Sequence, residues 1–168
     1  MQLILFRHGI AIDREDPDCP PDPERYLTKE GEHLTRQAAS GLKAMKVSPD
    51  RILTSPLLRA VQTAKIAADV LGLKGPELVV TDQLLSQQDP AEFLSSLSQY
   101  DGASVLAVGH APHIDEIVAR GIGISNGTVT SLKKAGAALV EFGPAMAIPG
   151  RLVWVLPAGT LRRISKKT

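Results

Sequence analysis

Cysteine and aromatic residues are scarce in this sequence of 168 residues, and neither sign of charge predominates. The one cysteine, Cys19, has no partner for an internal disulfide and is typical of a reducing compartment. Aromatic residues make up 4% of the chain and the net charge is +1, so the chain has neither a stacking platform nor a basic excess. These shortages argue against a disulfide-stabilised protein and against a protein that binds nucleic acid.

Long hydrophobic runs and metal-binding motifs are missing as well. No apolar stretch approaches the roughly 18 residues of a membrane span, and the run LILF before Arg7 is too short for the core of a signal peptide. The sequence has no H-E-x-x-H motif, no P-loop and no carboxylates at metal-ligand spacing. We therefore expect a cytoplasmic protein that binds no membrane, metal or cofactor.

The remaining composition suits one compact domain over residues 1–168, because 43% of the residues are hydrophobic and 22% are charged. Basic residues gather near the end of the chain, at Arg162, Arg163, Lys166 and Lys167. Charged residues at a terminus are usually solvated. We expect residues 160–168 to form a basic tail.

Six short apolar runs have the length of buried strands. They lie at residues 2–6, 51–54, 77–80, 104–109, 137–142 and 151–156. Between the first two runs, the acidic and proline-rich segment 13–26 predicts a long loop, and loops of this length are often functional.

Segments whose apolar residues have helical spacing separate the predicted strands. Thr28 is suited to cap a helix whose apolar residues are Leu34, Ala38, Leu42 and Met45. Ser55 and Pro56 open a second helix that ends near Gly72. Its predicted buried stripe is Leu57, Val61, Ala64, Ala68 and Leu71. A short helix at about 90–97 and a helix opened by Pro112 follow.

The alternation of strands and helices predicts an α/β fold, a three-layer α/β/α sandwich whose central sheet is mostly parallel. The last two strands are expected to form an antiparallel extension of that sheet.

Polar residues stand where the predicted strands end. Arg7 and His8 follow the first strand, Ser55 the second and His110 the fourth, while Arg59 lies one helical turn beyond Ser55. In open α/β sheets the binding crevice lies outside the carboxyl ends of the strands. Two arginines and two histidines that are distant in sequence are therefore expected to meet at one edge.

This set of residues suits a phosphoryl group. The planar fork of an arginine matches phosphate oxygens, and the helix starts at Ser55 and Pro112 add backbone donors. Gly9 is expected to keep the approach open by having no side chain. Neutral imidazole is a nucleophile near pH 7, and phosphoryl transfer otherwise needs positioning and charge neutralisation. Two arginines and a second, protonated histidine supply that neutralisation without a metal.

With these residues identified, the chain resembles the histidine phosphatase (phosphoglycerate mutase-like) superfamily. The R-H-G signature of that superfamily stands here as Arg7-His8-Gly9; its second arginine matches Arg59 in SPLLRAVQTA, and its second histidine matches His110 in VGHAP. Within the superfamily the chain is most similar to the short, SixA-type phosphohistidine phosphatases, through RHGIA, YLTKEG, ILTSPLLRAVQTA, VGHAPHI and SLKKAGAALVEF. The resemblance implies a phosphoglycerate mutase-like fold, His8 as the phosphorylated nucleophile, and binding of the phosphoryl group by Arg7, Arg59 and His110.

The chain departs from the wider superfamily at the general acid. Many members carry a glutamate that protonates an oxygen leaving group, whereas this region reads TDQLLSQQDP, in which Asp82 is the nearest acidic candidate and Asp89 the next. His113, on the first turn of its helix, either borders the substrate or is a partly exposed helix residue. Lys133 and Lys134 match the family pattern and are expected in a solvated turn.

We expect a metal-independent phosphatase that acts on phosphohistidine of a partner protein, such as a histidine-containing phosphotransfer domain. The P–N bond is labile, and the loss of general acid help, worth roughly 10²- to 10⁴-fold, affects ordinary phosphate esters most. Superfamily members that handle sugar phosphates are usually longer, with insertions over the substrate. Two alternatives remain: a small-molecule phosphomonoesterase or mutase of the same superfamily, and a non-catalytic module that binds phosphate or a phosphoprotein.

Overall fold

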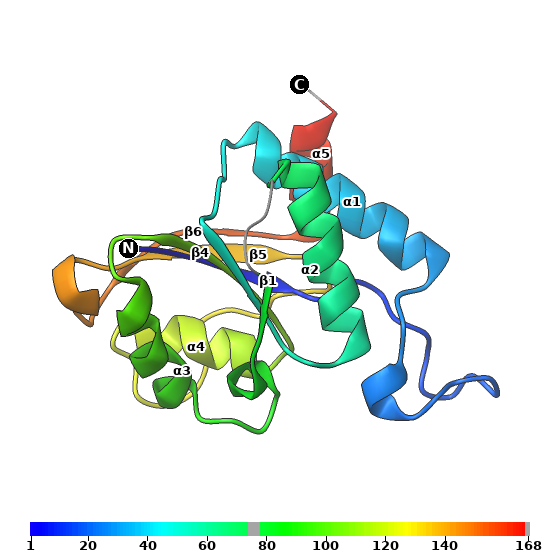
Figure 1. Ribbon diagram of the computed structural model, residues 1–168, viewed down its shortest axis with the longest axis horizontal. Helices are drawn as coiled ribbons and strands as arrows, with labels where there is room; N and C mark the ends of the chain where they lie inside the picture. The colour runs from blue at the N-terminus through cyan, green and yellow to red at the C-terminus, as the bar shows by residue number, and fades with distance from the viewer. Residues whose placement is uncertain (74–77, 167–168) are drawn as a thin grey trace.

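The computed structural model describes residues 1–73 and 78–166, in which helices cover both faces of a central sheet (Figure 1). The strands are β1 (Gln2–Arg7), β2 (Arg51–Thr54), β3 (Leu78–Val80), β4 (Ser104–Gly109), β5 (Ala137–Glu141) and β6 (Arg151–Leu156). The helices are α1 (Lys29–Ala44), α2 (Leu58–Leu71), α3 (Pro90–Ser96), α4 (His113–Gly121) and α5 (Ala158–Ser165). Residue 77 of the predicted third strand lies outside the described residues.

The sheet has the strand order β3-β2-β4-β1-β5-β6. β3, β2, β4 and β1 are parallel neighbours, while β5 runs antiparallel to β1 and β6 antiparallel to β5. The predicted α/β sandwich, its mostly parallel sheet and its antiparallel extension are therefore confirmed.

Alternation along β1 divides the core into two hydrophobic clusters. Leu3 and Leu5 face α3 and α4, whose Phe93 and Ile117 belong to the same cluster. Ile4 and Phe6 face the small residues of α1 and α2 and the buried Leu161 of α5. Because successive side chains of a strand point to opposite faces, one apolar run contributes to both layers. Figure 1 shows α1, α2 and α5 on one side of the sheet and α3 and α4 on the other.

The expectation that residues 160–168 form a basic tail is wrong over residues 160–166, the part that the structure describes. Residues Ala158–Ser165 form α5, and Leu161 is fully buried against α1. A Cβ atom on Gly41 would lie 2.1 Å from the carbonyl oxygen of Leu161, so the two helices meet backbone to backbone. Tertiary packing of one apolar stripe stabilises this short helix despite its basic residues.

The predicted buried stripe of α2 is also displaced. Of its five residues only Ala64 is buried; the helix instead buries Arg59, Ala60, Thr63, Ala64 and Ala67. Small residues let the helix lie close to the sheet, and Thr63 and Arg59 are buried because they make hydrogen bonds. The hydroxyl of Thr63 donates to Arg59 O and accepts from Gly9 N, which ties α2 to the end of β1.

Candidate active site

The carboxyl ends of β1, β2 and β4 bring the predicted residues together. Arg7 is in register with Gly109, so His8 and His110 follow on adjacent strands, and their ring centroids lie 5.0 Å apart. Thr54 is in register with Val108, which places Ser55 beside the same edge. The charges of His110, Arg59 and Arg7 all lower the pKa of His8. The two arginines and two histidines therefore form one cluster, as the sequence predicts.

His8 is held with one ring nitrogen free. Its Nδ1 lies 2.7 Å from the carbonyl oxygen of Gly9. A carbonyl oxygen only accepts, so Nδ1 carries the proton and Nε2 keeps its lone pair. Burial, together with the neighbouring His110, lowers the pKa of His8 to about 3. The side chain is thus a neutral imidazole at pH 7, which is the form needed for a nucleophile.

His110 lies beside His8 and bonds to Ser55. Its Nε2 is 2.8 Å from Ser55 Oγ, and burial and the charge of Arg59 lower its pKa to about 4. The protonated second histidine expected from the sequence is therefore not the resting form of the free protein. An anion bound beside His110 would favour the protonated imidazole. A phosphoryl group that binds here would therefore bring about the protonation of His110.

Ser55 does not act as the expected helix cap. α2 begins at Leu58, with Leu57 in the N-cap position, so neither Ser55 nor Pro56 belongs to the helix. The hydroxyl of Ser55 accepts a 3.3 Å bond from Leu57 N and otherwise bonds to His110. Its role is to orient the imidazole, and the helix starts two residues later than its sequence suggests.

Gly9 is required for helix packing rather than for access. A Cβ atom at this position would lie 2.1 Å from Oγ1 of Thr35 in α1. The backbone of Gly9 is also occupied, because its N–H donates to Thr63 Oγ1 and its carbonyl accepts from His8. The expectation that Gly9 keeps the phosphate approach open is wrong, and the glycine instead lets α1 reach the end of β1.

Arg7 is held from the interior. Its Nη1 donates to the carbonyl oxygen of Leu132 at 2.6 Å. The turn around Leu132 is fixed in turn by Asp115 of α4, whose Oδ1 accepts from Leu132 N at 2.9 Å and from Thr130 Oγ1. Burial lowers the pKa of Arg7 and the carboxylate of Asp115 opposes this, which favours the charged guanidinium. Asp115 thus positions Arg7 through the turn.

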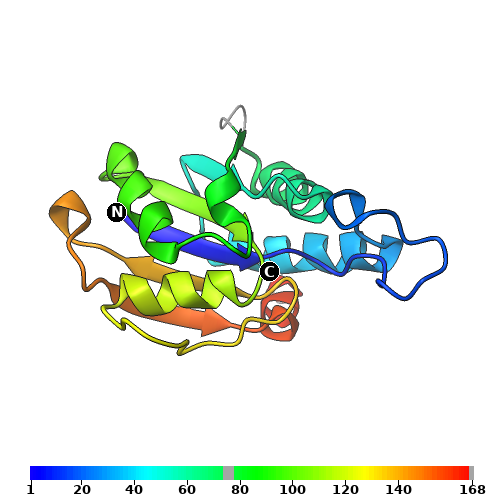
Figure 2. The same ribbon diagram turned by 90° about the horizontal axis from the view of Figure 1, so that it is seen from below.

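Arg59 is held by the proline-rich loop. Its Nη1 donates to the carbonyl oxygen of Asp22 at 2.8 Å, and its Nη2 to the carboxylate of Asp22 at 3.2 Å. Arg25 also donates to this carboxylate and anchors the loop by two bonds to Ile12 O. Burial opposes the ionised form of Asp22, but the bonds from Arg25 and Arg59 lower its pKa to about 2. The long loop is therefore part of the site, and it projects beyond the end of β1 (Figure 2).

Two buried nitrogen atoms of the cluster have no hydrogen-bond partner among the described residues. They are Nε of Arg7 and Nδ1 of His110. Buried polar groups are nearly always hydrogen-bonded, and an unpaired one in a cluster of positive groups indicates a site for an acceptor. An oxyanion beside His8 Nε2 would supply acceptors for both arginines and for His110.

The remaining predicted residues lie at the margin of the site or away from it. Asp82 is exposed at the start of a 3-10 turn, Asp82–Leu84, and is not among the charges that most affect either histidine. Asp89 caps α3 by accepting from Ala91 N. His113 is fully buried rather than partly exposed, and its Nε2 donates to Gln83 O. It joins α4 to the 3-10 turn.

Sequence reasoning missed Asp22, Arg25, Thr63 and Asp115. Each acts on a predicted residue through a contact with a distant segment, and no periodicity or motif spacing marks it. The length of the proline-rich loop was the one indication that this segment has a function.

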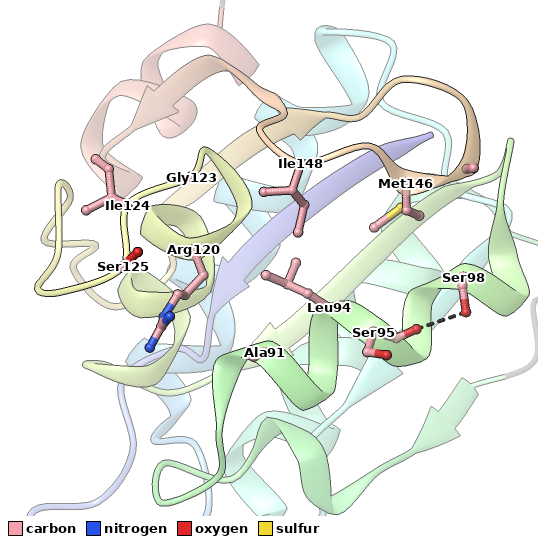
Figure 3. Close-up of a pocket in the computed structure, with 11 residues that line it drawn as sticks. Ala91, Leu94, Ser95, Ser98, Arg120, Gly123, Ile124, Ser125, Met146 and Ile148 are labelled. Atoms are coloured by element: carbon pink, nitrogen blue, oxygen red, sulfur yellow. Dashed lines mark hydrogen bonds between the residues drawn. The ribbon is translucent and has the colours of Figure 1, made fainter.

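A separate pocket of about 510 Å³ lies between α3, the end of α4 and the segment before β6 (Figure 3). Leu94 and Ile148 face each other across it, with Met146 nearby. Its only ionisable lining group is Arg120, at the end of α4 opposite to the His113 end that adjoins the cluster. Serine side chains line the pocket, but no histidine, cysteine or carboxylate does, and none of the clustered arginines and histidines borders it.

Residues 1–73 and 78–166 contain neither a cluster of metal ligands nor a helix suited to span a membrane. No group of three or more histidine, cysteine, aspartate or glutamate side chains is arranged to hold a metal ion. No helix in this part of the chain has the length and apolar character that crossing a membrane requires.

Several known proteins are similar to this chain in sequence and in fold. The family model described as histidine phosphatase superfamily (branch 1) matches residues 3–86. An uncharacterized protein of Picosynechococcus sp. is 37% identical over 148 residues, which cover 86% of this chain and 87% of that protein. Phosphohistidine phosphatase SixA of Escherichia coli is 33% identical over 126 residues, covering 71% of this chain and 73% of that protein. A solved structure of the protein histidine phosphatase SixA complexed with tungstate superposes with a TM-score of 0.84 at 29% identity, covering 96% and 99% of the two chains.

Proposed function

The chain belongs to the histidine phosphatase superfamily, and we propose that it is a metal-independent phosphatase that removes the phosphoryl group from phosphohistidine on a partner protein. The phosphatase activity follows from the family and from the similarity to SixA. The substrate, the phosphoenzyme and the assignment of residues are our proposal. One observation carries it: Nε2 of His8, which has no proton, lies in a cluster where Nε of Arg7 and Nδ1 of His110 are buried without a partner among the described residues.

The reaction has two displacements at phosphorus. In the first, Nε2 of His8 forms a bond to phosphorus while the P–N bond of the substrate breaks and its electron pair returns to the leaving imidazole, which takes a proton from water. In the second, water attacks phosphorus, the bond to His8 breaks, and the proton of the water returns to solvent as inorganic phosphate leaves. Arg7 and Arg59 neutralise the phosphoryl oxygens, and His110 donates to one of them once it is protonated.

The carboxylates near the cluster favour phosphohistidine over an ester. Asp22 is the carboxylate whose charge acts on His110, but its pKa of about 2 keeps it ionised and unable to give up a proton at pH 7. Asp82 is exposed to solvent and is the remaining candidate acid. A site with no better acid among residues 1–73 and 78–166 suits a substrate whose leaving group is imidazole.

The relatives support the same substrate. The name of the Escherichia coli relative states phosphohistidine phosphatase activity, and the similar solved structure holds tungstate, an oxyanion with the shape of phosphate. We propose a phosphotransfer domain that carries phosphohistidine as the partner. We expect the reaction to take place in the cytoplasm, where the single cysteine stays reduced.

The nucleophile is tested by His8→Ala. The variant should lose turnover of phosphohistidine and should not form an acid-labile phosphoenzyme with a phosphodonor. His33→Ala is the matched control, because His33 is exposed on α1, where it forms a hydrogen bond with Gln37. Normal turnover by His8→Ala would exclude the mechanism. If the wild-type protein binds phosphate but turns over no substrate, the non-catalytic module would be favoured.

The substrate class is tested by comparing kcat/KM for a phosphohistidine protein, a sugar phosphate and p-nitrophenyl phosphate in the presence of EDTA. Phosphohistidine should be preferred by roughly 10²-fold or more, the size of the missing general acid help. Asp82→Asn should change phosphohistidine turnover less than twofold. A preference for the esters, together with a large effect of Asp82→Asn, would favour the small-molecule phosphomonoesterase or mutase.

A further inference from the structure

A second positively charged region adjoins the active site. A hollow of about 600 Å³ is lined by four cations, Arg7, Lys133, Lys134 and Arg162, above a floor that includes Ile10 and Pro157. We call it the basic cleft. Arg7 belongs both to the cleft and to the catalytic cluster, so a group that binds in the cleft lies next to the phosphoryl group.

The two lysines are fixed relative to the catalytic cluster. They lie between Leu132, whose carbonyl accepts from Arg7, and Ala135, whose N–H donates to the carbonyl groups of Arg7 and His8. The opposite side of the cleft is formed by α5, which is held in place by the buried Leu161. Figure 2 shows the segment before β5 reaching α5 near the end of β1. The cleft is therefore a built surface, and Lys133 and Lys134 are exposed on it.

The charge of the cleft is not balanced from within. No carboxylate within residues 1–73 and 78–166 forms an ion pair with Lys133, Lys134 or Arg162. Burial and the charges of Arg7 and Arg25 lower the pKa of Lys134, and Asp13 opposes them. A cluster of like charges raises the local concentration of anionic partners and speeds their association.

We propose that the basic cleft binds carboxylates on the surface of a phosphoprotein substrate, so that the enzyme selects a phosphohistidine with acidic residues beside it. The inference rests on the proposed function and extends it from the reacting group to the partner. A protein surface fits better than a small bisphosphate for two reasons. The cations come from three separate segments around an apolar floor, which is the arrangement of a protein interface, and the lysines are exposed rather than buried around one anion.

Charge reversal tests the cleft in the full chain. Lys133→Glu/Lys134→Glu should lower the ratio of kcat/KM for an acidic phosphotransfer domain to kcat/KM for free phosphohistidine by about tenfold or more at low salt. The wild-type ratio should fall as salt is added, and the variant ratio should depend on salt much less. Lys43→Glu/Lys65→Glu is the matched control, because it changes the net charge equally at exposed positions on α1 and α2 outside the cleft.

The outcomes separate the two proposals. If the wild-type protein does not dephosphorylate phosphohistidine at all, the proposed function is wrong and the role of the cleft falls with it. If the wild type is active but the two double variants have the same ratio, the cleft does not select the partner. If turnover of a small bisphosphate falls while turnover of the phosphoprotein does not, the cleft is a subsite for a small second anion and the protein surface is excluded.

Discussion

The charges of Arg7 and Arg59 both act on His8, but the regions that hold the two arginines are built differently. Arg7 is held from the interior by Leu132, and the buried carboxylate of Asp115 fixes the backbone of Leu132. Arg59 is held from the surface by Asp22, whose side chain is 45% exposed. A broken buried hydrogen bond leaves an unsatisfied group, whereas an exposed ion pair contributes little to stability.

This difference divides two tasks between the two sides of the site. The interior side sets the position of Arg7 and leaves its Nε unpaired for a ligand. The loop side sets how strongly Arg59 can bind an anion, because the carboxylate of Asp22 occupies a donor of Arg59 that an incoming phosphoryl group also needs. Matched substitutions on the two sides should therefore differ in size and in direction.

The largest effect is expected for Arg59→Ala. Asp22 neutralises part of the Arg59 charge but does not replace its fork of donors, so kcat/KM for phosphohistidine should fall by roughly 10²- to 10³-fold. Arg36→Ala is the control, because Arg36 forms an exposed ion pair between α1 and α2, and it should change kcat/KM less than about twofold. A loss below tenfold for Arg59→Ala would mean that Asp22 keeps this arginine away from the substrate.

The interior side is tested by Asp115→Ala. The change removes the acceptor for Leu132 N and Thr130 Oγ1, so the turn that holds Arg7 loses its support. We expect kcat/KM to fall by roughly 10- to 100-fold, as for other residues that orient a site from behind. Asp115→Asn keeps an acceptor oxygen and should restore most of the activity. If the two variants lose thermal stability equally, and their kcat/KM values fall only in proportion to the loss of folded protein, Asp115 does not position Arg7.

The catalytic cluster could be predicted because its residues follow apolar strands. The runs that end at Arg7 and at Gly109 predict parallel strands, and parallel neighbours bring their carboxyl ends to one edge. His8 and His110 then follow from chain order alone. The resemblance to the superfamily added their roles.

Asp22, Asp115 and α5 could not be predicted, for physical reasons. Asp22 lies in a polar loop and Asp115 on a helix, and each acquires its role only when folding brings a distant arginine or turn to it. In α5, Arg162 and Arg163 conceal the apolar pair Ala158 and Leu161, and the close approach of Leu161 to α1 depends on Gly41. Single-sequence patterns report local periodicity and not these contacts.

The buried imidazole on the interior side predicts a pH dependence of stability. Burial and His110 lower the pKa of folded His8 to about 3, whereas an unfolded histidine has a pKa near 6.5. Between these values the unfolded chain binds more protons, so the contribution of His8 is fully present above pH 6.5 and is lost as the pH falls. Urea unfolding at pH 7.5 and pH 5 should show a loss of stability to which His8 contributes about 2 kcal/mol, and His8→Asn should remove that share while leaving the share of His110, whose pKa burial also lowers. His33→Asn, at an exposed position, should retain the loss, and equal pH dependence in both variants would contradict the assignment.

The smallest effect is expected on the loop side, for Asp22→Ala. Removing the carboxylate frees Arg59 for an anion and removes a repulsive charge, so phosphate and tungstate should inhibit at concentrations up to about fivefold lower, the size of an exposed ion pair. The change also leaves Arg25 its two bonds to Ile12 O, which keep the loop in place. Calorimetric titration with tungstate measures the affinity directly, with Asp69→Ala as the control for an exposed aspartate paired to an arginine. Weaker binding by Asp22→Ala would show that the carboxylate orients Arg59 rather than competing with the ligand, and the two sides of the site would then share one task.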